Sequence, residues 1–197
     1  MTSLNALTTT APVAAPRFSG PVGGPCRPRG QRVNRTFLFT DIVASTTLLS
    51  AIGDDAWSDL MEWHDETLRR LFVAHLGREV KQVGDGFFTV FTDAYSALAC
   101  AIGIQRALSG TGRPRGFTSP VRIGVHRSHA TQVADDFIGT GVHEAARIGA
   151  LAEGGEVLTS VSTLAAAWNA FPDHHRRSVT LRGFPEPIEL TTVECHA

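Results

Sequence analysis

The chain of 197 residues has few cysteines, no long apolar run and no excess of either charge. Its three cysteines are widely scattered, at Cys26, Cys100 and Cys195, which argues against a disulfide framework or a cysteine-based zinc site and favours a reducing environment. No segment approaches the roughly 18 consecutive apolar residues of a membrane-spanning helix, and the N-terminus lacks the basic and apolar blocks of a signal peptide. We therefore expect a cytoplasmic protein with no membrane partner.

The two charges are balanced, with 18 lysines and arginines against 19 acidic residues. Proteins whose main partner is a nucleic acid usually carry a marked basic excess on one face. We therefore expect no nucleic-acid partner, and any anionic ligand must be held by local groups.

Two regions differ in composition. Residues 1–33 are rich in Ala, Pro, Gly and Thr and show no hydrophobic period, which predicts a disordered tail or linker. Residues 34–197 carry the apolar patterns, and the hydrophobic content of 43% for the whole chain suits one compact domain.

Within that domain, apolar periodicity and turn residues predict an alternation of strands and helices. A D-G pair between two apolar runs is a strong hairpin signal, so we expect Asp85 at a hairpin tip. The predicted elements are a strand at 36–41, a helix at 54–76, a hairpin of 79–83 with 87–91, a helix at 93–108, a loop at 110–120, a hairpin within 122–134, a helix at 140–151, a strand at 156–159, a short helix at 162–168, and strands at 178–181 and 188–193.

This order predicts an α+β fold, a ferredoxin-like βαββαβ sandwich with additional C-terminal strands. In such a fold, helices cover one face of a mostly antiparallel sheet.

Two carboxylates are candidates for a shared site. Asp41 ends a predicted central strand, and Asp85 lies on the hairpin expected beside it, so both can face one point. Mg²⁺ prefers carboxylate and phosphate oxygens, and two such ions can activate an attacking oxygen and neutralise a leaving pyrophosphate. The alternative is that Asp41 caps a turn and Asp85 is simply a favoured turn residue.

After Asp41 the chain enters a helix, so its free backbone N–H groups and the Thr46 hydroxyl are candidates for holding phosphate oxygens. Serine and threonine are equally common as ordinary helix caps.

Three ordered motifs resemble the class III adenylyl cyclases, and most closely the bacterial, actinobacterial-type branch. They are F-T-D-I-V-A-S-T at residues 39–46, E-V-K-Q-V-G-D-G at 79–86 and D-F-I-G-T-G-V-H-E-A-A-R at 136–147. The resemblance covers about residues 35–193.

The resemblance implies roles for particular residues. Asp41, Asp85 and the Ile42 carbonyl match the family's ligands for two divalent cations, Mg²⁺ or Mn²⁺. Lys81 and Asp136 match the pair that reads the adenine edge, which implies ATP rather than GTP as the substrate.

Three further positions match residues that act on the ribose or the phosphates. Arg147 matches the arginine that stabilises the transition state. Arg182 stands where the family usually has a lysine for the terminal phosphates, and His143 stands where many members have an asparagine that holds the ribose.

The implied activity is conversion of ATP to 3′,5′-cyclic AMP and pyrophosphate at sites shared between the subunits of a homodimer.

Ala44 replaces a glycine often found after the first aspartate, and Val125-His126-Arg127-Ser128 replaces a more usual I-H-T-G run. The alternative function is that of a catalytically weak, dimeric nucleotide-binding module that regulates through binding. A diguanylate-forming relative would carry a G-G-D/E-E-F hairpin, whereas residues 83–87 read V-G-D-G-F.

Overall fold

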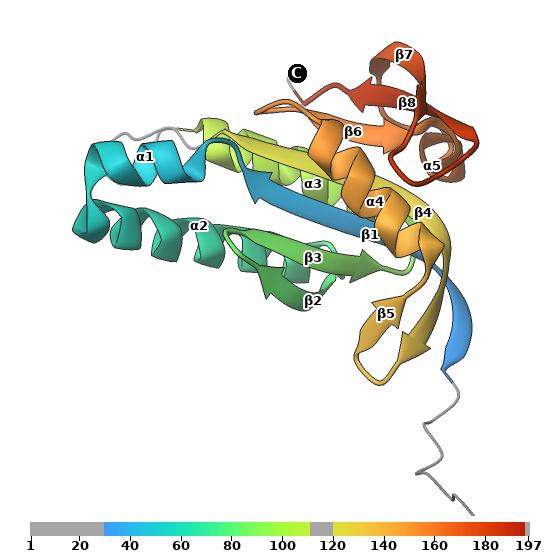
Figure 1. Cartoon of the computed structure of the whole chain (residues 1–197), viewed down its shortest axis with the longest axis horizontal. Helices are drawn as coiled ribbons and strands as arrows, with labels where there is room; N and C mark the ends of the chain where they lie inside the picture. Colours follow the sequence, from blue (N-terminus) through green and yellow to red (C-terminus); the bar gives the residue numbers. More distant parts are fainter. Residues whose placement is uncertain (1–29, 111–119, 196–197) are drawn as a thin grey trace, which may run out of the picture.

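The computed structural model describes residues 30–110 and 120–195. Their strands form one sheet in the order β2-β3-β1-β4-β6-β8-β7, with β5 paired to β4 (Figure 1). Residues 1–29 of the predicted tail and most of the predicted loop at 110–120 lie outside the described residues. Within them, no helix is long and apolar enough to cross a membrane.

The first part of the sheet is the predicted βαββαβ unit. Strands β1 (Gln31–Ile42), β3 (Gly86–Phe91) and β4 (Val121–Val133) pair in antiparallel fashion around β1, and β2 (Arg78–Val83) pairs with β3. Helices α1 (Ser45–Ile52) and α2 (Asp54–Ala74) connect β1 to β2, and α3 (Ala94–Ser109) precedes β4. The α+β fold and the mostly antiparallel sheet are confirmed.

The remaining elements extend this unit. The hairpin predicted within 122–134 is wrong: these residues lie almost entirely in the single long strand β4, whose hairpin partner is the short strand β5 (Asp136–Ile138) that follows it. Helix α4 (Thr140–Leu151) then leads to β6 (Val157–Ser160), which is parallel to β4. Helix α5 (Val161–Ala166) and strands β7 (Asp173–Thr180) and β8 (Pro187–Val193) complete the chain, with β8 antiparallel to β6.

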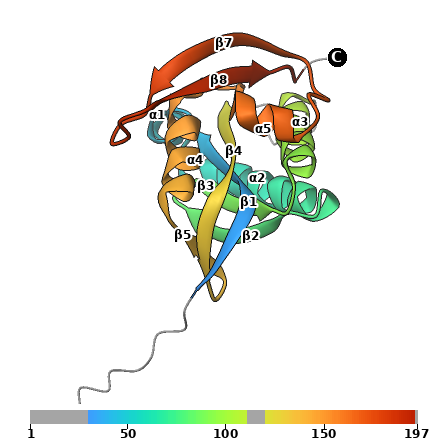
Figure 2. The ribbon, with the colours of Figure 1, turned by 90° about the vertical axis from the view of Figure 1, so that its right-hand side faces the viewer.

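Helices cover both faces of the sheet, not one face as predicted. Alternate residues of β1 point to opposite sides: Leu38 packs in the cluster that contains residues of α2 and α3, whereas Phe37 packs in the cluster that contains Ala145 of α4. Figures 1 and 2 show α4 on the other side of β1 and β4 from α3. The single-face expectation was wrong because the periodicity of α4 shows that one side is apolar but not which face of the sheet it meets.

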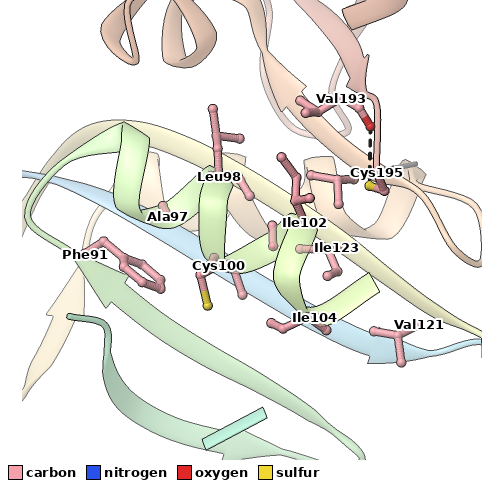
Figure 3. Packing of buried hydrophobic residues seen from close by; sticks show 14 of the residues in the cluster. Phe91, Ala97, Leu98, Cys100, Ile102, Ile104, Val121, Ile123, Val193 and Cys195 are labelled. Atoms are coloured by element: carbon pink, nitrogen blue, oxygen red, sulfur yellow. Dashed lines mark hydrogen bonds between the residues drawn. The ribbon is translucent and has the colours of Figure 1, made fainter. Parts of the chain in front are cut away.

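The main core lies between the sheet and α3. Figure 3 shows Leu98, Ile102 and Ile104 of α3 beside Ile123 of β4. Cys100 also lies in this cluster, and burial raises the pKa of its thiol to about 12. Burial likewise raises the pKa of the Cys195 thiol to about 11. Both thiols are free and behave as small apolar core groups.

Two strands are longer than predicted. Strand β1 begins at Gln31, so Gln31 to Val33, which the composition placed with the tail, pair with Gln132 to Ala130 of β4. Strand β7 begins at Asp173, five residues before the strand predicted at 178–181, so it includes His174 and His175. Both extensions are polar segments at the N-terminal ends of their strands. They lack the alternation of apolar and polar residues from which a strand is predicted.

Candidate functional site

Asp41 lies near the end of the central strand β1, on the face that α4 covers. It lines a cavity of about 160 Å³ together with Phe39 and Arg122. Ile42, the last residue of the strand, has its side chain buried in the core. Only the backbone of Ile42 is therefore free to contribute to a site.

The hairpin between β2 and β3 places Asp85 next to the end of β1. Val83 pairs with Gly86, so the turn residues are Gly84 and Asp85 rather than Asp85 and Gly86, and Gly84 has the positive φ of 63° that such a turn requires. The hydroxyl of Thr40 accepts a hydrogen bond of 2.9 Å from the Phe87 N–H.

Gly86 makes the close approach possible. A Cβ at this position would lie 1.9 Å from the Thr40 carbonyl oxygen and 3.2 Å from Asp41 Cα. Only glycine allows the hairpin to contact β1 at this point. The two aspartates predicted to act together are thus carried by backbone segments in direct contact.

Asp85 does not line the cavity of Asp41; it borders a separate hollow of about 510 Å³ between α1, α2 and the hairpin. Thr46 of α1 lines the same hollow. The entry to α1 passes through Ala44, whose φ of 56° is the left-handed conformation that favours glycine. Asp85 and the candidate phosphate-binding residue Thr46 therefore face one space.

The two candidate base-reading residues bind each other. Lys81 Nζ donates a hydrogen bond of 2.7 Å to Asp136 Oδ2, and the Phe137 N–H donates one of 2.8 Å to Asp136 Oδ1. The hydrogen bond from Lys81 is the main cause that holds the pKa of Asp136 below its ordinary value.

This pair lies at the wall of an apolar cavity of about 290 Å³ between β1, β3, β5 and α4. Such a cavity with a few polar groups at its edge suits a flat heteroaromatic ring. The residues lining it are Phe39, Lys81, Phe88, Asp136, Phe137, Ile138, Gly139, Val142, His143 and Ala146.

Two candidate catalytic residues are exposed on α4. His143 and Arg147 are four residues apart, so they lie on the same side of the helix. His143 lines the cavity of Lys81 and Asp136, whereas Arg147 lines none of the cavities described above. Arg147 therefore lies on an exposed side of α4.

Arg182 lies in the connection between β7 and β8 and is exposed. Its neighbours Leu181 and Phe184 pack with Ile148 of α4. The segment around Arg182 therefore packs against α4, the helix that carries Arg147. Arg182 itself does not line the cavity of Lys81 and Asp136.

Sequence reasoning missed Arg122 of β4. This residue is directly opposite Asp41 in the β1–β4 pairing, and its Nε donates a hydrogen bond of 2.8 Å to Asp41 Oδ2, with a second bond from Nη2 to the same oxygen. An arginine inside the otherwise apolar run V-R-I-G-V was the available signal.

Comparison with known proteins identifies the family. Residues 29–195 match the family described as the adenylate and guanylate cyclase catalytic domain. A putative adenylate cyclase of Rhizobium meliloti is 34% identical over 125 residues, covering 62% of this chain and 21% of that protein. An uncharacterized protein of Mycobacterium tuberculosis is 30% identical over 171 residues, covering 82% of this chain and 55% of that protein. The chain thus spans only part of the length of these relatives.

Solved structures share the fold. The adenylyl cyclase CyaB from P. aeruginosa has a TM-score of 0.73 at 23% identity, covering 83% of this chain and 95% of that one. The guanylyl cyclase Cya2 has a TM-score of 0.74 at 22% identity, covering 84% and 93%. Because both adenylyl and guanylyl cyclases share the fold, the fold alone does not select the base. The chain belongs to the family of adenylate and guanylate cyclase catalytic domains, the class III nucleotide cyclases.

Proposed function

We propose that this domain is an adenylyl cyclase that converts ATP to 3′,5′-cyclic AMP and pyrophosphate. The observation that carries the proposal is the Lys81–Asp136 pair at the wall of the apolar cavity. An ammonium donates to a ring nitrogen of adenine, and a carboxylate accepts from its exocyclic amine. Guanine presents an acceptor where adenine has this amine, so the same pair disfavours GTP.

The site between β1 and the hairpin fits divalent cations. Asp41 and Asp85 supply carboxylate oxygens from segments in direct contact, and the backbone of Ile42 adds a carbonyl. All-oxygen donor sets suit Mg²⁺ or Mn²⁺ completed by substrate phosphates. Held by these residues, two such ions would supply activation of the ribose 3′-hydroxyl and positive charge for the leaving pyrophosphate. Thr46, which lines the same hollow as Asp85, would bind phosphate oxygens.

The residues of α4 and the β7–β8 connection act on the nucleotide. His143, which lines the cavity of Lys81 and Asp136, would bind the ribose. Arg147 supplies a guanidinium for the negative charge that develops at the α-phosphate, and Arg182 contributes charge toward the terminal phosphates. These groups hold and orient ATP, while the chemistry consists mainly of positioning and charge stabilisation.

We propose that the active form is a homodimer with sites shared between subunits. Arg147 is exposed on α4, where solvent would weaken its effect on a transition state. Two apolar side chains that border the site are also exposed, Val83 by 58% and Ile138 by 55%. A second copy that covers this face would bury these apolar groups and exclude water from Arg147.

The decisive experiment measures cyclic nucleotide formation by the purified protein with ATP or GTP and Mn²⁺ or Mg²⁺. We expect cyclic AMP from ATP, and loss of it in Asp85→Ala. Cyclic AMP formation that survives this substitution would remove the two-metal assignment.

Mixing inactive variants tests the shared site. In the proposed dimer, each site takes its metal ligands from one subunit and its base-reading pair from the other. A heterodimer of Asp41→Ala and Lys81→Ala chains therefore retains one site with both contributions intact, and activity should partly return. The matched control mixes Asp41→Ala with Asp85→Ala, where both chains lack a metal ligand and no intact site can form. Equal behaviour of the two mixtures would contradict shared sites.

A regulatory, catalytically weak nucleotide-binding module is the second candidate. The observation that favours it is the Arg122–Asp41 ion pair, which engages one of the two candidate metal ligands. Under this function the protein binds ATP but forms no cyclic nucleotide under any of the four conditions above.

A further inference from the structure

Strand β2 contains an irregularity next to the base-reading lysine. Glu79 pairs with Thr89 and Lys81 pairs with Phe88, so two residues of β2, Val80 and Lys81, stand opposite one residue of β3. This is the pattern of a β-bulge, which redirects side chains at a functional site.

The bulge places neighbouring side chains on one face. Val80 packs against the cluster that includes Phe88, and Lys81 enters the cavity lined by Phe88 and Asp136. In a regular strand consecutive residues point to opposite faces. The direction of Lys81 therefore depends on the bulge, and whatever fixes the bulge fixes the position of the ammonium.

Arg69 of α2 holds both sides of this bulge from the opposite face. Its Nε donates a hydrogen bond of 2.9 Å to Glu79 Oε2, and its Nη2 donates one of 3.1 Å to Gln82 Oε1. Its guanidinium also lies 4.9 Å from the centre of the Phe87 ring, on the strand that follows Asp85. One side chain thus contacts both strands of the hairpin.

A carboxylate on α2 completes the arrangement. Asp65 Oδ2 accepts hydrogen bonds from Arg69 Nη1 at 3.3 Å and from Gln82 Nε2 at 3.0 Å. The Asp65 side chain is only 17% exposed and that of Glu79 is 30% exposed. A planar guanidinium shared between two partly buried carboxylates is geometrically specific, unlike an isolated surface ion pair.

We propose that Arg69 is a positioning residue for base recognition: it fixes the bulge between Glu79 and Gln82 and thereby sets where Lys81 meets the adenine ring. The inference rests on the proposed function, since it concerns the choice between ATP and GTP. A merely structural Arg69 would instead stabilise the packing of α2 against β2 without affecting that choice.

The test measures equilibrium binding of 3′-deoxy-ATP and 3′-deoxy-GTP, which lack the attacking hydroxyl, by calorimetry with Mg²⁺. Arg69→Met keeps an unbranched side chain but removes the guanidinium, with its hydrogen bonds and its contact with Phe87. We expect the affinity for 3′-deoxy-ATP to fall about tenfold, the value of one charge-assisted hydrogen bond, and that for 3′-deoxy-GTP to change little. Arg70→Met, at an exposed neighbouring position, is the control and should retain the parent ratio of the two affinities.

A double-mutant cycle with Lys81→Ala separates positioning from general destabilisation. If Arg69 acts through Lys81, the double variant should bind 3′-deoxy-ATP no more weakly than Lys81→Ala alone. Equal losses for both nucleotides, or independent losses that multiply in the double variant, would overturn the proposal. Gln82→Met, which removes the two bonds beyond the bulge, to Arg69 and to Asp65, should give the same selective loss if Arg69→Met does not fold.

Hydrogen exchange distinguishes failure of this inference from failure of the proposed function. Faster amide exchange in β2 of Arg69→Met, with ATP discrimination unaffected by Lys81→Ala, would remove the adenine assignment and with it the role in base choice. Unchanged exchange in β2, with Lys81→Ala losing discrimination as expected, would overturn the positioning role alone.

Discussion

Arg122 and Asp41, which are 81 positions apart in the chain, face each other across the β1–β4 pairing and share two hydrogen bonds. The side chains are 32% and 41% exposed. The guanidinium therefore neutralises a carboxylate that we assign to metal binding. At the proposed metal site, a divalent cation and Arg122 would compete for the same oxygen.

The first prediction is that Arg122→Met tightens metal binding in the absence of nucleotide. A partly exposed ion pair contributes about 0.2–1 kcal/mol, which corresponds to a gain in Mn²⁺ affinity of up to about fivefold. Electron paramagnetic resonance of Mn²⁺ titrated into the nucleotide-free protein measures this directly. Arg177→Met removes the same charge from an exposed position of β7 and should leave the affinity unchanged. Weaker Mn²⁺ binding in Arg122→Met would show that Arg122 does not compete.

The second prediction concerns Ala44, the N-cap residue of α1, which has a φ of 56°. A residue with a Cβ in this conformation destabilises the folded state by about 1–2 kcal/mol, and glycine relieves this strain. The greater freedom of glycine in the unfolded chain offsets part of the gain. Ala44→Gly should therefore raise the free energy of unfolding by about 0.5–1 kcal/mol. Ala51→Gly, in the helical part of α1, should lower it by about 1 kcal/mol. Urea denaturation measures both, and a loss of stability in Ala44→Gly would contradict the strain.

The strands and helices could be predicted because their signals are local. The apolar run before Asp41 predicts a buried strand, and the glycines around Asp85 predict a tight hairpin. These two features, together with the order of elements, were sufficient for the ferredoxin-like α+β fold.

Other features depend on long-range pairing. The bulge beside Lys81 arises only when β2 pairs with β3, and the contact of Arg122 with Asp41 depends on the register of β1 against β4. Gln31 belongs to a strand only because it pairs with Gln132, near the C-terminal end of β4. No local composition encodes these contacts. The roles of individual residues in base, metal and phosphate binding remain predictions.

The third prediction concerns the contact between the hairpin and β1. A Cβ on Gly86 would lie 1.9 Å from the Thr40 carbonyl oxygen, whereas one on Gly84 would meet no atom within 4 Å. Gly86→Ala should therefore cost about 3 kcal/mol or more, at the upper end of overpacking effects, and abolish activity by displacing Asp85. Gly84→Ala should cost only about 1 kcal/mol, from its positive φ. Urea denaturation with a cyclase assay tests the pair, and equal costs would contradict the contact.

The fourth prediction concerns His64, whose side chain is fully buried in α2 and whose Nδ1 lies 3.2 Å from Asp65 Oδ1. Among the described residues, its Nε2 has no hydrogen-bond partner. Burial lowers the pKa of His64 below its ordinary value of 6.5, while the hydrogen bond to Asp65 and the charges of Asp65 and Asp85 oppose that change and the charge of Arg69 adds to it. The folded protein therefore keeps His64 neutral at a pH where the unfolded chain protonates it.

Because the unfolded chain binds more protons between the two pKa values, the free energy of unfolding rises with pH in that interval. The slope from one such group is at most about 1.4 kcal/mol per pH unit, and the contribution is complete above the ordinary pKa of 6.5. His64→Phe should lose this part of the slope in urea denaturation below that pH. Between about pH 7.5 and 8.5 the parent and the variant should run parallel, which is the internal control. An unchanged slope at acidic pH would show that His64 is protonated equally in both states.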